Sequence, residues 1–88
     1  MHQVYRGINR TTGEVYHGVS KDPKARRDGS HCVGGTKALS HWDCDSDEIQ
    51  WRIVSQHRTQ TKASQVAHGH ERSYRHRRGY RNIETSGI

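Results

Sequence analysis

The stretch that decides the fold is QVYRGINRTTGEVYHGVS, residues 3–20. Polar and apolar residues alternate over 3–8 and again over 14–20, which is typical of half-buried β-strands. The run NRTTG between them, residues 9–13, is rich in turn-forming residues. The first twenty residues therefore predict a β-hairpin.

The two strands of this hairpin divide their side chains between two faces, because successive strand residues point in opposite directions. Tyr5 and Tyr16 lie opposite in parity to the aliphatic residues of their own strands. The aliphatic set, which predicts one apolar face, is Val4, Ile8, Val15 and Val19. Two phenols that emerge together from the other face are unusual unless a pocket requires them.

Beyond the hairpin, the sequence predicts two short helices and a third strand. Asp22-Pro23 is a typical helix start, and Gly29 would stop that helix after about Asp28. A second short helix is expected from Thr36 to Trp42. Residues 49–54 then alternate as in a strand whose core-facing side chains we predict to be Ile49, Trp51 and Ile53.

The longest helix is expected to begin at Thr59 or Thr61 and to end before Gly79. Glu71 borders the apolar stripe of this helix because it lies four residues after Ala67 and three before Tyr74. The stripe, spaced by three, four and seven residues, is Ala63, Val66, Ala67 and Tyr74.

Length and charge narrow the class of protein. Eighty-eight residues, 28% of them hydrophobic, predict a single domain over 1–88 with a thin core. A net charge of +6 favours a polyanionic partner, because bound phosphates release counterions. No apolar stretch is long enough to span a membrane, and two cysteines make no disulfide framework. A reduced, cytoplasmic setting is expected by default.

Specific motifs resemble those of the GIY-YIG nucleases. Gln3-Val4-Tyr5, followed eleven residues after the tyrosine by Tyr16-His17-Gly18, is similar to the paired motif that names the family. The first motif keeps only its tyrosine, and the second keeps tyrosine and glycine. Arg26, Glu71 and Asn82 follow in the order of the family's helix arginine, metal-binding glutamate and terminal Tyr-Asn segment.

The resemblance implies an α+β fold, a three-stranded antiparallel sheet flanked by helices, and a metal-dependent DNA endonuclease. Tyr5 would be the general base for a water nucleophile, with Tyr16 assisting it. Arg26 would clamp the phosphate, Glu71 would hold Mg²⁺ or Mn²⁺, and Asn82 would fix the geometry of the site. This chemistry is reasonable, because one carboxylate suffices when water and phosphate complete the magnesium octahedron.

One histidine and one alternative metal site complete the predicted chemistry. The family often places a histidine four residues after its arginine; Ser30 occupies that position after Arg26, while His31 stands four residues after Arg27. His31 is therefore a catalytic candidate. A tetrahedral zinc site is the alternative metal hypothesis, although it lacks the usual paired short loops. Its ligands would be His31, Cys32, His41 and Cys44.

The basic C-terminal part of the long helix predicts the DNA contact, because arginines bind phosphates. The predicted nucleic-acid-binding residues are Arg27, Arg72, Arg75, Arg78 and Arg81. A homodimer or a partner protein would then supply sequence specificity. Two alternatives stay open: a catalytically silent nucleic-acid-binding module on the same fold, and an unrelated basic interaction protein. Homing, restriction, repair and phage-accessory roles stay open as well.

Overall fold

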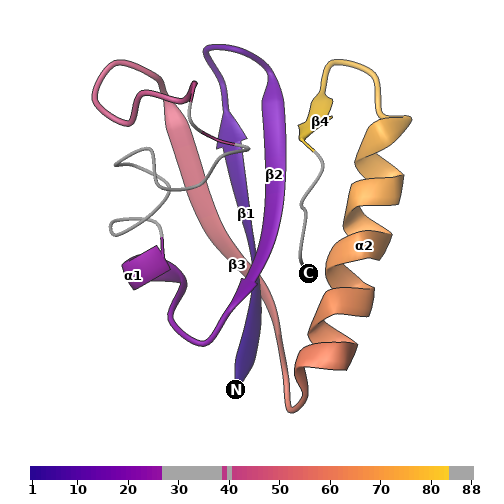
Figure 1. Cartoon of the computed structure of the whole chain (residues 1–88). Helices are drawn as coiled ribbons and strands as arrows, with labels where there is room; N and C mark the ends of the chain where they lie inside the picture. The colour runs from indigo at the N-terminus through magenta and orange to yellow at the C-terminus, as the bar shows by residue number, and fades with distance from the viewer. Residues whose placement is uncertain (27–38, 40, 84–88) are drawn as a thin grey trace.

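A computed structural model of the chain describes residues 1–26, 39 and 41–83, without the side chains of residues 25 and 26. It contains a sheet, one long helix and one short helix (Figure 1). The elements are β1 (His2–Asn9), β2 (Glu14–Ser20), α1 (Pro23–Arg26), β3 (Ile49–His57), α2 (Gln60–Arg75) and β4 (Arg81–Ile83). The α+β class and the hairpin predicted from the sequence are thus confirmed.

The sheet has four strands in the order β3-β1-β2-β4. β1 is antiparallel to both β2 and β3, as expected, but β4 adds to the outer edge of β2 in a parallel orientation. The prediction of a purely antiparallel three-stranded sheet was therefore wrong. Gly79, with a φ of +88°, turns the chain after α2, and the Arg81 amide then donates to the Gly13 carbonyl at 2.9 Å.

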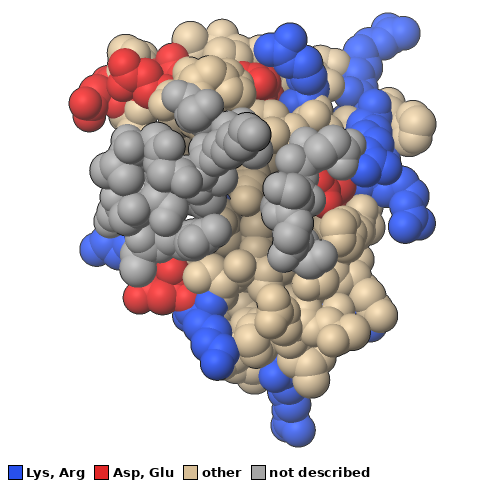
Figure 2. Space-filling view, viewed as in Figure 1, with Lys and Arg blue, Asp and Glu red and all other residues tan. Residues whose placement is uncertain are grey.

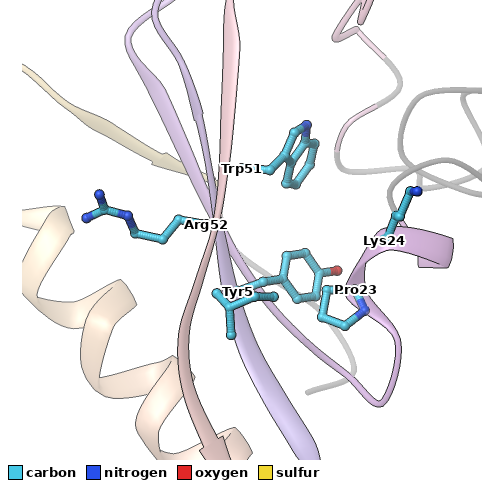
Figure 3. A pocket seen from close by; sticks show the side chains of 6 residues that line it. Tyr5, Pro23, Lys24, Trp51 and Arg52 are labelled. Carbon is cyan, nitrogen blue, oxygen red and sulfur yellow. The ribbon is translucent and has the colours of Figure 1, made fainter.

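The helices α1 and α2 lie on opposite faces of the sheet, which Figure 3 shows nearly edge-on. On the α2 face, Val4 packs against Ala63 and Ala67, with Val19 and Val66 at the margin. These contacts confirm the apolar face of the hairpin and the predicted helix stripe.

The other face carries a second, aromatic cluster. Tyr16, Leu39 and Trp42 form its buried part, and Trp51 and Ile83 pack against them. Tyrosine and tryptophan rings, instead of the usual aliphatic side chains, therefore fill much of this layer. The molecule consequently has two small cores, one on each face of the sheet.

Strand β3 differs from its prediction at one point. Val4 of β1 pairs with Ser55 and Tyr5 pairs with Ile53, so Val54 is an extra residue in a β-bulge. Ile53 pairs with Tyr5 and so lies on the same face as Trp51, as the alternation predicts, but it borders an open pocket and is 47% exposed. The prediction that Ile53 is part of the core was therefore wrong, whereas Val54 packs against the α2 core.

The expectations for the helix ends and the cysteines can be compared with the structure only in part, because some of these residues lie outside the described ranges. Thr59 is the N-cap of α2, as predicted, and its hydroxyl accepts from the Lys62 amide at 3.2 Å. Cys44 is disulfide-bonded, contrary to the expectation of reduced cysteines. The continuation of α1 to residue 28, most of the helix predicted over 36–42, and Cys32 lie outside the described residues. Among described helices, none could cross a bilayer.

Candidate functional site

The two motif tyrosines meet on the sheet face that α1 covers. Their rings are 6.2 Å apart between centroids and nearly perpendicular, with Tyr5 2% and Tyr16 5% exposed. Tyr5 lies opposite Gly18 and Tyr16 lies opposite Gly7, so the phenols are diagonal neighbours on adjacent strands. The predicted convergence of Tyr5 and Tyr16 is confirmed.

Two glycines make this aromatic packing possible. A Cβ added to Gly18 would lie 2.4 Å from the Tyr5 hydroxyl and ring, and one added to Gly7 would lie 2.6 Å from the Trp51 ring. Both distances are far inside the ordinary carbon contact distance of about 3.5 Å. The glycine of the Tyr16-His17-Gly18 motif thus has a direct structural reason: it leaves the space that the Tyr5 ring occupies.

A pocket of about 230 Å³ opens beside Tyr5, between β3 and α1. Figure 3 shows the Tyr5 ring and Trp51 on the α1 side of the sheet, with the hydroxyl directed toward Pro23 and Lys24, whereas the Arg52 side chain points toward α2. Arg26 follows in α1, two residues after Lys24. The backbone therefore places Arg26 on the helix that adjoins the tyrosines.

Glu71 is carried by α2, the helix on the other face of the sheet from α1. It is 1% exposed, one helical turn after Ala67, and its carboxylate is 3.0 Å from Nδ1 of His68. Ala67 packs against Val4, whereas Tyr5, the next residue of β1, points to the opposite face. Glu71 and the tyrosines therefore come from elements that lie on opposite faces of the sheet.

Asn82 lies on the same side as Glu71. In the parallel β2–β4 pair it is in register with Val15, whose parity matches the α2 face. The structure thus divides the predicted constellation into two groups: Tyr5 and Tyr16 with the α1 that carries Arg26 on one face, and Glu71 with Asn82 on the other. His31 and Arg27 lie outside the described residues.

The described residues do not fit a magnesium or manganese ion in the predicted way. A hydrated divalent ion needs an accessible carboxylate, because it keeps several waters, and Glu71 is almost completely covered. No group of three or more His, Cys, Asp or Glu among the described residues could hold a metal. The disulfide at Cys44 also removes one thiolate of the alternative zinc site.

A second, larger hollow lies over the β1 and β3 strands beside the end of α2. Its volume is about 540 Å³, and its lining is strongly cationic. The lining residues are Arg6, Ile8, Arg10, Gln50, Trp51, Arg52, Tyr74 and Arg77, and we call this the arginine groove. Among the described residues, its lining contains four guanidinium groups and no carboxylate.

Tyr74 organises one wall of the arginine groove. The guanidinium carbons of Arg6 and Arg77 each lie 5.0 Å from the centre of its ring, and Arg77 is also 5.5 Å from that of Tyr80. Tyr80 meets Tyr74 edge to face at 5.3 Å. Stacked guanidinium groups keep their N–H edges available for anions, so the wall presents fixed donors.

Arg6 also reaches a buried histidine pair. Its Nε donates to Nε2 of His17 at 2.8 Å, and the His17 ring stacks on His70 at 5.3 Å. Burial, followed by the nearby Arg6 and His70 charges, lowers the pKa of His17 to about 3. Burial and Arg6 likewise lower the pKa of His70. Both rings are therefore neutral at pH 7, which leaves Arg6 as the cation of this cluster.

Acidic residues gather elsewhere. Figure 2 shows their side chains at the end of the molecule near the turn before β3, while Lys and Arg lie mainly along the α2 side. Glu14 is buried, with both carboxylate oxygens 2.9 Å from Nε2 of His41. Burial opposes ionisation, but the bonds to His41, Thr12 and Trp42 outweigh it and lower the pKa of Glu14. His41, one of the ligands in the alternative zinc hypothesis, is therefore engaged with Glu14.

The arginines predicted to bind DNA are exposed but do not line the groove; these are Arg72, Arg75, Arg78 and Arg81. The sequence reasoning missed Arg6, Arg10, Arg52 and Arg77, which do. One signal was present in the first strand. Arg6 lies between Val4 and Ile8 on the face expected to be apolar, where an arginine is unusual unless it has a specific role.

Comparison of the chain with protein-family models, curated proteins and solved structures gives no match. The resemblance to the GIY-YIG nucleases therefore rests on the motifs themselves.

Proposed function

We propose that this protein is a nucleic-acid phosphodiesterase of the GIY-YIG type, and that Tyr5 and Tyr16 mark its catalytic face. The observation that carries the proposal is the buried pairing of the two motif tyrosines beside an open pocket, with Gly18 leaving room for the Tyr5 ring. The strand order, with β1 between β2 and β3, is what brings the two motifs together.

The residues around this pocket suit an anionic phosphodiester. Lys24 lines the pocket, and Arg26 follows on the same short helix. Cations at these positions would balance the charge that develops on the phosphate oxygens. The Tyr5 hydroxyl is directed toward Pro23 and Lys24, and its proposed role is to orient an attacking water on this side of the sheet and accept its proton. Because the described carboxylates do not fit a metal here, the proposed step uses only the protein side chains and water.

The second candidate is a catalytically silent nucleic-acid-binding module on the same fold. The specific observation in its favour is the burial of Glu71, whose carboxylate is almost completely covered on α2. A chain that keeps the phosphate-binding surface but has no accessible carboxylate at the tyrosine pocket among its described residues would bind nucleic acid without cutting it.

Plasmid nicking in the presence and absence of Mg²⁺ or Mn²⁺ separates the two functions. We expect Tyr5→Phe and Tyr16→Phe to reduce cleavage by roughly 10²–10⁴-fold, the usual contribution of a positioned acid–base group. Ser73→Ala, which removes a hydroxyl from an exposed residue of α2 outside both hollows, is the control and should keep full activity. Loss of one hydroxyl leaves the aromatic packing in place, so circular dichroism should not change.

Glu71→Gln completes the experiment. If metal-dependent cleavage disappears in this variant and in Tyr5→Phe, one site uses both residues. If cleavage survives in Glu71→Gln but not in Tyr5→Phe, the tyrosine pocket works without Glu71. If the wild-type protein binds DNA but never cleaves it, the phosphodiesterase proposal is wrong and the silent module is correct.

A further inference from the structure

The arginine groove is the strongest feature that the proposed activity does not use. It lies on the sheet face opposite the tyrosine pair, yet both hollows share Trp51 and Arg52 of β3. β3 is an outer strand of the sheet and no other described strand pairs with its outer edge, so the two hollows meet around that edge. A ligand long enough to occupy both would pass over this edge.

The charge of the groove is not balanced within the described protein. None of its four arginines forms an ion pair with a described carboxylate; Arg6 bonds to neutral His17, and Arg10 donates to the Gln50 amide oxygen at 3.0 Å. Four cations held around one hollow repel each other and concentrate the positive potential inside it. An anionic ligand with several charges removes that repulsion.

The aromatic residues indicate the form of the ligand. Trp51 and Tyr74 line the groove among the arginines, and Tyr80 lies against Tyr74. Alternating cations and aromatic rings are the usual surface for single-stranded nucleic acid, where arginines follow the backbone and rings contact the bases. The groove lies over β1 and β3 beside the end of α2, so cations and aromatic rings of separate elements face the same hollow.

We propose that the arginine groove binds a single-stranded segment of nucleic acid and that this segment crosses the β3 edge at Arg52 toward the tyrosine pocket. This inference deepens the proposed function because it names the binding surface, but it is tested by binding and not by cleavage. A chain that never cleaves could still confirm it, and a chain that cleaves could still contradict it.

The test measures binding of a fluorescent 20-nucleotide single strand by anisotropy at several salt concentrations. The groove variant is Arg52→Gln/Arg77→Gln, and the matched control is Arg58→Gln/Lys62→Gln, which removes two exposed charges near the other end of α2. A second comparison, Arg72→Gln/Arg78→Gln, removes two of the arginines that the sequence pointed to first. All three variants lose the same charge.

We expect the groove variant to lower the slope of log K against log salt by about 1.4, since each phosphate contact with a single strand contributes about 0.7. At 0.1 M salt that corresponds to a loss of affinity of about 25-fold. The control should lose much less. Equal losses in all three variants would overturn the proposal, because they would show attraction by net charge alone.

The last measurement is binding of a duplex of the same sequence. If the duplex binds more tightly than the single strand and depends equally on Arg52 and Arg77, the single-strand assignment is wrong. Circular dichroism and thermal melting of each variant check folding. Both groove residues are exposed, so their replacement should leave the fold intact. If the groove variant nevertheless melts early, Arg10→Gln alone replaces it, with half the expected change in slope.

Discussion

Replacement of Gly18 by alanine tests the packing on which the candidate active site depends. The new Cβ would stand 2.4 Å from both the hydroxyl oxygen and the terminal ring carbon of Tyr5. The ring cannot move away freely, because it is 2% exposed and packs against Trp51 at 6.1 Å and Tyr16 at 6.2 Å. Either the phenol leaves its place or β2 separates from β1.

The expected cost is about 2–3 kcal/mol, toward the upper end of the range for overpacked cores. A protein of this size has a stability of only a few kcal/mol, so Gly18→Ala should be partly unfolded at 37 °C. In urea, with a slope of roughly 1 kcal/mol per molar for a small domain, the midpoint should fall by about 2 M. Catalytic activity should fall as well, because the Tyr5 hydroxyl is displaced.

Two controls test whether the clash with the Tyr5 ring is the cause of the lost stability. Gly69→Ala lies on α2 with nothing within 4 Å of the added Cβ, and it should stabilise the helix by about 0.5–1 kcal/mol. In a Tyr5→Leu background, which removes the end of the ring, Gly18→Ala should cost less than about 0.5 kcal/mol. A similar cost of Gly18→Ala with and without the Tyr5 ring would refute the reasoning, since the clash could not then be its cause.

Three further predictions concern stability. The pKa of His17 is lowered from 6.5 to about 3 in the folded chain, so the neutral form of His17 stabilises the fold above pH 6.5 and this stability is lost as the pH falls toward 3. The free energy of unfolding should therefore be about 2 kcal/mol lower at pH 5 than at pH 7.5, and His17→Gln should reduce that difference. Asn9→Ala should lower the free energy of unfolding, measured in urea, by about 2–3 kcal/mol. The buried Asn9 side chain accepts from the backbone amides of Thr11 and Thr12 and donates to the Asp47 carboxylate at 2.9 Å. An unchanged midpoint of urea denaturation would contradict this. Thr59→Ala should remove the cap of α2 and cost about 1 kcal/mol, whereas Thr59→Ser should keep most of it.

Local patterns in the sequence predicted much of the fold. The alternation of residues 3–20 specified the hairpin, its faces and the meeting of Tyr5 with Tyr16, because strand parity is a property of the backbone alone. The cap at Thr59 and the spacing of Ala63 and Ala67 likewise predicted α2. These features depend on neighbours within one or two turns, which a sequence displays directly.

The errors arose where distant segments meet. The bulge at Val54 shifts the register of β3 against β1, and nothing in that strand's own alternation indicates it. The parallel pairing of β4 depends on Gly79 returning the chain along β2. For the same reason, the order of residues along the chain could not reveal that α2, which carries Glu71, lies on the other face of the sheet from the Tyr5 ring. Which face a helix covers is decided by tertiary packing.

The free edge of β3 also has a consequence for self-association. β3 is nine residues long, and an outer strand of that length can pair with the same strand of another molecule and begin aggregation. The bulge at Val54 twists this edge, and Arg52 places a charge beside it, and both features discourage such pairing. The Arg52→Gln/Arg77→Gln variant of the binding experiment removes part of this protection. Neutralising Arg52 should therefore lower the highest concentration at which the protein remains monomeric.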